Sequence, residues 1–170
     1  METEKRRSKL LRILHQAKGP VTGMELGLSL GVSRQVIVQD IAILRASGEQ
    51  VLATPQGYLS SSLLQENTRR VVACQHTKEQ IAEELGIIVD LGGKALDVII
   101  EHPVYGELRG NLMIACRRDL CLFLQQLEKT AAHPLSMLTY GVHLHTLEAA
   151  DEQNMDEIVG ALEKAGFLTK

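Results

Sequence analysis

A tight turn around Gly31 joins two short segments that both have the periodicity of an amphipathic helix. Residues 22–31 and residues 33–48 each begin with a side chain that commonly caps a helix, Thr22 and Ser33. Each segment is followed or closed by a glycine, which is the usual stop signal of a helix. The apolar positions of the two segments are Met24, Leu26, Leu30, Ile37, Ile41 and Leu44. Two helices joined by a glycine turn of about two residues predict a helix-turn-helix.

The residues on both sides extend this pair into a small domain. Residues 10–17 have helical spacing and end at "KGP", which predicts a preceding helix. Residues 50–60 form two short extended runs around Pro55-Gln56-Gly57, a pattern that indicates a β-hairpin. Residues 1–62 are therefore predicted to form a winged helix-turn-helix domain.

The second helix of the pair carries side chains suited to reading DNA. Four polar residues lie outside its apolar stripe and near its start: Ser33, Arg34, Gln35 and Gln39. Arginine binds guanine through two hydrogen bonds and glutamine binds adenine in the same way, so these residue types favour contacts with bases. Contacts with phosphates are predicted for Lys5, Arg6, Arg7 and Lys18. The alternative is a three-helix bundle used for protein contacts. DNA binding is favoured, by a dimer that reads two half-sites.

The distribution of charge agrees with a DNA-binding front. The net charge of the chain is −3, but residues 1–62 hold eight basic and five acidic side chains, and residues 63–170 hold ten and sixteen. A basic first third joined to an acidic remainder predicts that nucleic acid meets the N-terminal part. Aromatic residues make up only 3% of the chain, so base stacking on aromatic side chains is not expected.

The remaining residues alternate between strand and helix patterns. After a polar connector at about residues 60–69, the order is β-α-β-β-α-β-α. This order predicts an α+β fold, in which residues 63–170 form an α/β sandwich with helices on one face of a mainly antiparallel sheet. No apolar run approaches the ~18 residues of a membrane span, and the N-terminus lacks the features of a signal peptide. Cys74, Cys116 and Cys121 are expected to be reduced thiols of a cytoplasmic protein.

Four residues of this second part form a candidate metal site. His143 and His145 alternate on one strand and therefore share a face. His76 lies where the first strand passes into its helix, and Glu84 lies within that helix. Three imidazoles and a carboxylate suit a transition metal such as Zn, Ni, Fe or Mn, without identifying which. Alternation of histidines on a solvent-facing strand is also common, and His15 and His133 are interpreted as ordinary surface or core residues.

Three separated motifs, "QHTKEQIAEEL", "EHPVYGEL" and "GVHLHTLEA", resemble those of the 3H domain, which is named for three histidines. Residues 5–60 resemble the winged helix-turn-helix of the biotin repressor. Together, residues 5–168 resemble the niacin-responsive transcriptional repressor family in the expected order. The resemblance implies a cytoplasmic bacterial homodimer that controls genes of NAD synthesis and niacin uptake. It also implies one divalent transition metal per chain, bound by His76, Glu84, His143 and His145, with nicotinic acid beside it as corepressor.

Three residues are interpreted as candidate contacts to the other end of nicotinic acid: His102, Tyr105 and Arg117.

The sequence leaves two other functions open. A metal-dependent hydrolase would use the same four ligands to activate water, but no separate general base is evident, and the chain is not expected to be an enzyme. In a metal-sensing regulator, the metal itself would be the signal. Corepression predicts that the bound form holds the two reading helices of a dimer one DNA turn apart.

Overall fold

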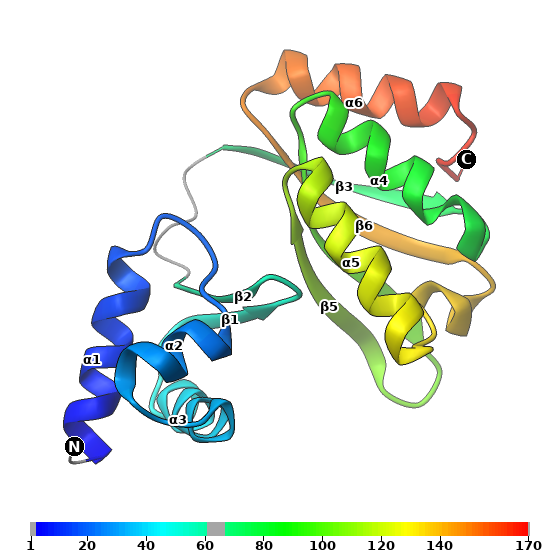
Figure 1. Cartoon of the computed structure of the whole chain (residues 1–170). Helices are drawn as coiled ribbons and strands as arrows, with labels where there is room; N and C mark the ends of the chain where they lie inside the picture. Colours follow the sequence, from blue (N-terminus) through cyan, green and yellow to red (C-terminus); the bar gives the residue numbers. More distant parts are fainter. Residues whose placement is uncertain (1–2, 61–66, 170) are drawn as a thin grey trace. The chain divides into compact units, whose positions relative to one another are not determined.

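The computed structural model describes residues 3–60 and 67–169 (Figure 1). Its contacts divide the chain into two compact units, Met1–Gln65 and Glu66–Lys170. We call these the N-terminal unit and the C-terminal unit and describe each by itself.

Over its described residues, 3–60, the N-terminal unit contains three helices and a hairpin. Their bounds are α1 Thr3–Gln16, α2 Gly23–Leu30, α3 Arg34–Ala46, β1 Val51–Thr54 and β2 Gly57–Ser60. Thr22 and Glu25 form a reciprocal capping box at the start of α2, and Gly31 ends that helix in the left-handed conformation with φ 66°. The helices enclose an aliphatic core of Leu10, Leu14, Leu26, Leu30, Ile37, Ile41, Leu44 and Val51. The predicted winged helix-turn-helix is confirmed.

The wing contains one feature that the sequence pattern did not predict. The backbone of Val21 pairs with that of Tyr58 through two hydrogen bonds of 2.8 Å, one in each direction. The segment before α2 thus adds a third short strand position beside the hairpin. Gly57 is required there, because its φ is 133° and a Cβ atom would lie 2.4 Å from the carbonyl oxygen of Val21.

Over residues 67–169, the C-terminal unit is a four-stranded sheet with three α-helices. Its elements are β3 Thr68–Gln75, η2 Lys78–Gln80, α4 Ile81–Asp90, β4 Lys94–His102, β5 Gly106–Ile114, α5 Arg117–Thr130, η3 Leu135–Thr139, β6 Val142–Ala149 and α6 Glu152–Lys164. The strand order is β3-β6-β4-β5, and every neighbouring pair is antiparallel. Figure 1 shows α4, α5 and α6 on one face of this sheet. The α+β class and the predicted order of elements are confirmed.

The core of the C-terminal unit lies between the sheet and these helices, and it is mostly aliphatic. Leu85 and Ile88 of α4, Leu120 of α5 and Ile158 of α6 pack against Leu147 and its neighbours on the sheet. The same face of the sheet carries the side chains of β6 residues 143 and 145, since odd-numbered residues of this strand point to the helices.

Membrane-spanning potential is weak in the part of the chain that is described. No single helix there is long and apolar enough to cross a membrane, and one bent pair, α2 with α3 at 100°, passes by length and composition alone.

Candidate metal centre and nucleic-acid interface

The four residues predicted as metal ligands come together in the C-terminal unit. Glu84, in the first turn of α4, lies at the centre of the group. Its Oε2 is 2.6 Å from Nε2 of His76 and 3.4 Å from Nε2 of His145, and its Oε1 is 3.3 Å from Nε2 of His143. All four side chains are buried. Glu83, one position away, is exposed, so the helix presents a single carboxylate to the histidines.

Each histidine is anchored through its other ring nitrogen. Nδ1 lies 2.8 Å from the carbonyl oxygen of Thr77 in His76 and 2.8 Å from that of Gly141 in His143. In His145 it lies 2.5 Å from the carbonyl oxygen of Asp97. A carbonyl oxygen only accepts hydrogen bonds, so Nδ1 carries the proton in all three rings. The three Nε2 atoms therefore converge on the carboxylate of Glu84.

This arrangement has a consequence for the charge of the site. A neutral imidazole with its proton on Nδ1 has a lone pair on Nε2, and a carboxylate also has only lone pairs to offer. Lone pairs that face each other at 2.6 to 3.4 Å repel unless a proton or a cation lies between them. Histidines that donate Nδ1–H to backbone carbonyls and direct Nε2 inward have the orientation of metal ligands. The donor set thus fits a divalent transition metal.

The pKa shifts of the group have the same physical cause. Burial alone would raise the pKa of Glu84, but hydrogen bonds with the three histidines hold it far below its usual range. For His76 and His145, burial alone would lower the pKa, but the hydrogen bond to Glu84 and its negative charge outweigh this effect and raise it. The site therefore favours positive charge beside the buried carboxylate.

An irregularity between β4 and β6 positions His145. These strands pair at Lys94 and Ala95 and again at Ile99, with a shift of register between. Asp97 lies within this gap, where its Oδ1 accepts a hydrogen bond of 2.8 Å from the backbone N–H of Thr146. The Asp97 carboxylate thus takes the place of a strand carbonyl as acceptor for the Thr146 N–H. The backbone carbonyl of Asp97 accepts a hydrogen bond from Nδ1 of His145 instead.

Gly141 links the other two histidines. Its carbonyl oxygen accepts from Nδ1 of His143 at 2.8 Å and from the backbone N–H of His76 at 3.4 Å. Its φ is 88°, and a Cβ atom at this position would lie 2.3 Å from the carbonyl oxygen of His76. Only glycine fits this approach.

Cys74 is a member of the cluster that the sequence did not assign to the site. It is fully buried and lies directly opposite His143 in the β3–β6 ladder. Its Sγ, a carboxylate oxygen of Glu84 and a ring nitrogen of His143 all lie within 4.8 Å of one another. The available signal was the i,i+2 spacing of Cys74 and His76, which places both near one face at the end of an extended segment.

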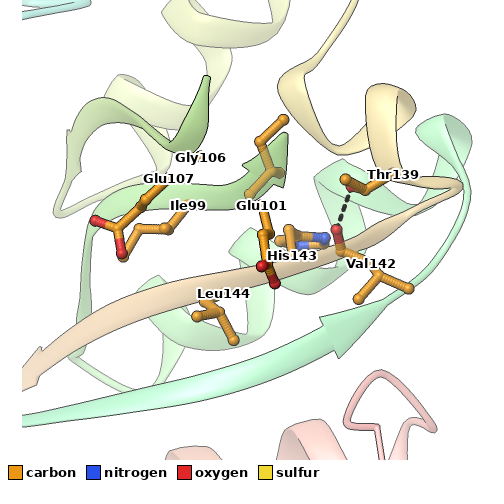
Figure 2. Close-up of a pocket in the computed structure, with 9 residues that line it drawn as sticks. Ile99, Glu101, Gly106, Glu107, Thr139, Val142, His143 and Leu144 are labelled. Carbon is orange, nitrogen blue, oxygen red and sulfur yellow. Dashed lines mark hydrogen bonds between the residues drawn. The ribbon is translucent and has the colours of Figure 1, made fainter. Parts of the chain in front are cut away.

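A pocket of about 400 Å³ adjoins the cluster at His143, between the end of β4, the start of β5, the end of η3 and the start of β6. Figure 2 shows His143 beside Val142 and Thr139, with Glu101, Glu107, Ile99 and Leu144 around the opening. The pocket lining includes His143, whose side chain is only 2% exposed.

The three predicted effector contacts do not line this pocket. His102 and Tyr105 stack on each other at the tip of the β4–β5 hairpin, with ring centroids 5.0 Å apart, and their neighbours Glu101 and Gly106 line it. Arg117 forms an ion pair with Asp90 at the opposite end of α4 from Glu84.

On the N-terminal unit, the residues predicted to read bases lie at the start of α3. Ser33 caps this helix by accepting a hydrogen bond from the backbone N–H of Val36. Arg34, Gln35 and Gln39 are exposed, as contacts with bases require. Lys18 is exposed and Arg7 is half-buried.

Arg6 already has a carboxylate partner within the N-terminal unit, unlike an arginine side chain that is available to contact a phosphate. Its guanidinium donates to both carboxylate oxygens of Asp40, with Nε–Oδ2 at 2.6 Å and Nη2–Oδ1 at 3.1 Å. Asp40 lies on α3 and is only 2% exposed. The pair joins α1 to the inner side of the reading helix, which favours a structural role for Arg6.

We expect Arg6→Ala to lower the melting temperature of the chain, because Asp40 would be left buried and without its partner. Lys9→Ala, at an exposed position of the same helix, serves as the control and should leave the melting temperature unchanged. Circular dichroism during heating measures both variants. Equal melting temperatures for the two would show that the pair contributes nothing to stability.

A winged helix-turn-helix joined to a unit with a buried histidine–carboxylate cluster defines a DNA-binding transcription regulator with a second, ligand-type site. Comparison with known families agrees: residues 6–59 match the HTH domain and residues 69–170 match the 3H domain. The chain is 46% identical over 165 residues to "Probable transcription repressor NiaR" of Thermotoga maritima, covering 97% of this chain and 94% of that protein. It is 45% identical over 168 residues to "Transcription repressor NadR" of Bacillus subtilis, covering 97% and 93%.

The chain belongs to the niacin-responsive transcriptional repressor family. It is a DNA-binding repressor and not an enzyme.

Proposed function

We propose that this repressor controls genes of NAD synthesis and niacin uptake, with nicotinic acid as corepressor bound beside a divalent transition metal. The observation that carries the proposal is the convergence of three Nε2 atoms on the buried Glu84, from histidines whose Nδ1 atoms are each anchored to a backbone carbonyl. Such a group is stabilised by a proton or a cation between the facing lone pairs, and its nitrogen and carboxylate donors suit Zn, Ni, Fe or Mn.

In this proposal the metal is held by His76, Glu84, His143 and His145. When bound, it supplies a Lewis acid that can take the ring nitrogen or the carboxylate of nicotinic acid. The pocket beside His143 has the size of a small-molecule site. Glu101 and Glu107 line this pocket, and their negative charges would repel the carboxylate of nicotinic acid. We therefore orient the acid with its carboxylate toward His143 and its ring against Ile99 and Leu144.

The positions of the three predicted effector contacts decide how each is assigned in this proposal. His102 and Tyr105 stay candidates because they adjoin the pocket at the hairpin tip. The ion pair of Arg117 with Asp90 favours a role in joining α4 to α5. We assign residues 1–62 as the DNA-binding domain and residues 63–170 as the domain for metal and effector.

We further propose that the protein acts in the cytoplasm, where its operator lies, and as a homodimer. One reading helix offers little contact area, and two helices must meet successive major grooves about 34 Å apart. Nicotinic acid acts as corepressor by favouring the dimer geometry that meets this spacing. A metal-sensing regulator is the second candidate, supported by the same cluster of ligands, and it differs in responding to metal without nicotinic acid.

The test is fluorescence anisotropy with promoter DNA from upstream of the organism's niacin or NAD genes, at fixed salt. Metal-replete protein is compared with the His143→Ala, His145→Ala double variant, each with and without nicotinic acid. We expect the acid to tighten binding of the replete protein and to have no effect on the variant. DNA binding that follows metal and ignores nicotinic acid would support the metal sensor instead.

Base and phosphate contacts are separated by a second pair of variants. Arg34→Ala should weaken operator binding by about 1–3 kcal/mol and relax specificity, because it removes contacts with a base. Lys18→Ala should weaken binding to operator and random DNA alike and reduce the salt dependence of log K by about 1. Anisotropy across a salt series on both DNAs measures these effects. Equal losses on both DNAs for Arg34→Ala would remove it from base readout.

A further inference from the structure

Cys74 differs from the other two cysteines of the chain in its surroundings. Cys116 and Cys121 are exposed, at the start and on the outer side of α5. Cys74 is 0% exposed and lies on β3, facing the helices. The groups nearest to its thiol include the polar atoms of the histidine–carboxylate cluster.

The fold brings this sulfur to the cluster through two independent constraints. Cys74 and His143 are direct partners in the β3–β6 ladder, so their side chains leave the sheet on the same face. The second constraint is α4, which covers that face and directs Glu84 toward His143 on the neighbouring strand β6. Cys74 therefore cannot point elsewhere without a change of register, which would move every side chain of β3 to the other face.

The distances suit donors to one ion. Sγ of Cys74, an oxygen of Glu84 and a nitrogen of His143 lie within 4.8 Å of one another. Two donors of a tetrahedral zinc-type ion lie roughly 3.6 Å apart, given bonds of about 2.1 Å to nitrogen and about 2.3 Å to sulfur. The three side chains must therefore draw together by about 1 Å around a bound ion.

We propose that Cys74 is a fifth donor of the metal centre and contributes a thiolate sulfur beside Glu84 and the three histidines. This inference rests on the proposed metal site. On binding, a bond forms between sulfur and the ion, and the thiol proton leaves to solvent. A site with this sulfur donor prefers thiophilic ions, such as Zn and Co, more strongly than a site made of the three histidines and Glu84 alone. It also disfavours Mn.

The test uses the full-length, reduced protein, stripped of metal and titrated with Co²⁺ without oxygen. A thiolate bound to Co²⁺ gives a charge-transfer band in the near ultraviolet, which imidazole and carboxylate donors do not produce. We expect this band in the wild-type protein at one Co²⁺ per chain. We also expect it in the Cys116→Ser, Cys121→Ser double variant, where Cys74 is the remaining thiol. It should be absent from Cys74→Ser.

The double variant keeps the test decisive even where Cys74→Ser fails to fold. Stoichiometric Co²⁺ binding without the band, in wild type or in the double variant, would overturn the thiolate ligand and leave the histidine–carboxylate site intact. Persistence of the band in folded Cys74→Ser would overturn it as well. If wild-type protein binds no Co²⁺, both the metal centre and the fifth donor fail. In a competition experiment, the ratio of Co²⁺ affinity to Mn²⁺ affinity should be roughly 10-fold lower in Cys74→Ser than in the wild-type protein.

Discussion

Glu84→Gln should nearly abolish the stabilisation of this chain by a divalent metal, while leaving the shape of the side chain almost unchanged. Glu84 is the only carboxylate that all three Nε2 atoms face among the described residues, and it is 1% exposed. Metal at about 100 times its dissociation constant adds ~2.7 kcal/mol to the free energy of unfolding. For a unit of this size, that raises the melting temperature by roughly 10–20 °C.

Loss of this anionic donor should weaken metal binding about 100-fold, or ~2.7 kcal/mol. The same metal concentration would then add only ~0.4 kcal/mol, a rise of about 2–3 °C. Thermal melts with and without Zn²⁺ or Ni²⁺ measure the difference within each variant. Glu83→Gln is the matched control, since Glu83 is exposed on the same turn of α4. A metal-induced shift that is equal in both variants would exclude Glu84 as a ligand.

Gly141→Ala should strongly destabilise the apo-protein. Alanine at a φ of 88° costs about 1–2 kcal/mol. Its Cβ would also lie 2.3 Å from the carbonyl oxygen of His76, so backbone must move at the position that orients two histidines. We expect a loss of at least ~3 kcal/mol in the free energy of unfolding, and loss of metal binding in any folded fraction.

Urea unfolding and metal titration test this change. Gly160→Ala is the control: Gly160 is an exposed residue of α6, and a Cβ atom there meets nothing within 4 Å. Because alanine is the better helix former, that variant should gain about 0.5–1 kcal/mol and bind metal normally. Equal stabilities for the two variants would mean that the loop at Gly141 yields without cost.

The parts of the fold that follow from local chemistry could be predicted from the sequence. Thr22, Ser33 and Gly31 mark helix ends by capping and by a left-handed backbone, and the structure places the ends there. The alternation of His143 and His145 on one strand similarly follows from the geometry of an extended chain. The order of elements in the C-terminal unit also depends mainly on local pattern.

What could not be predicted depends on pairing between distant segments. Cys74 belongs to the cluster only because β3 pairs with β6 in the register that sets it opposite His143. The ion pair between Arg6 and Asp40 depends on the packing of α1 against α3, and the two residues are 34 positions apart in the sequence. The anchoring of His145 by Asp97 depends on a local break in the β4–β6 ladder, over 48 residues. Composition and spacing carry no signal for the pairing of distant segments on which these contacts depend.

The anchoring of the histidines divides the site into two parts with different local stability. His76 and His143 are held by carbonyls of the surface segments at Thr77 and Gly141, and these segments are bonded to each other. His145 is held by a strand of the sheet, and Glu84 by a helix in the core. When the surface segments open, the first two imidazoles can turn away together while the other two donors stay in place. In the proposed metal site, we expect exchange of the ion to need a local opening of these segments, at a rate that depends on the loop rather than on the core.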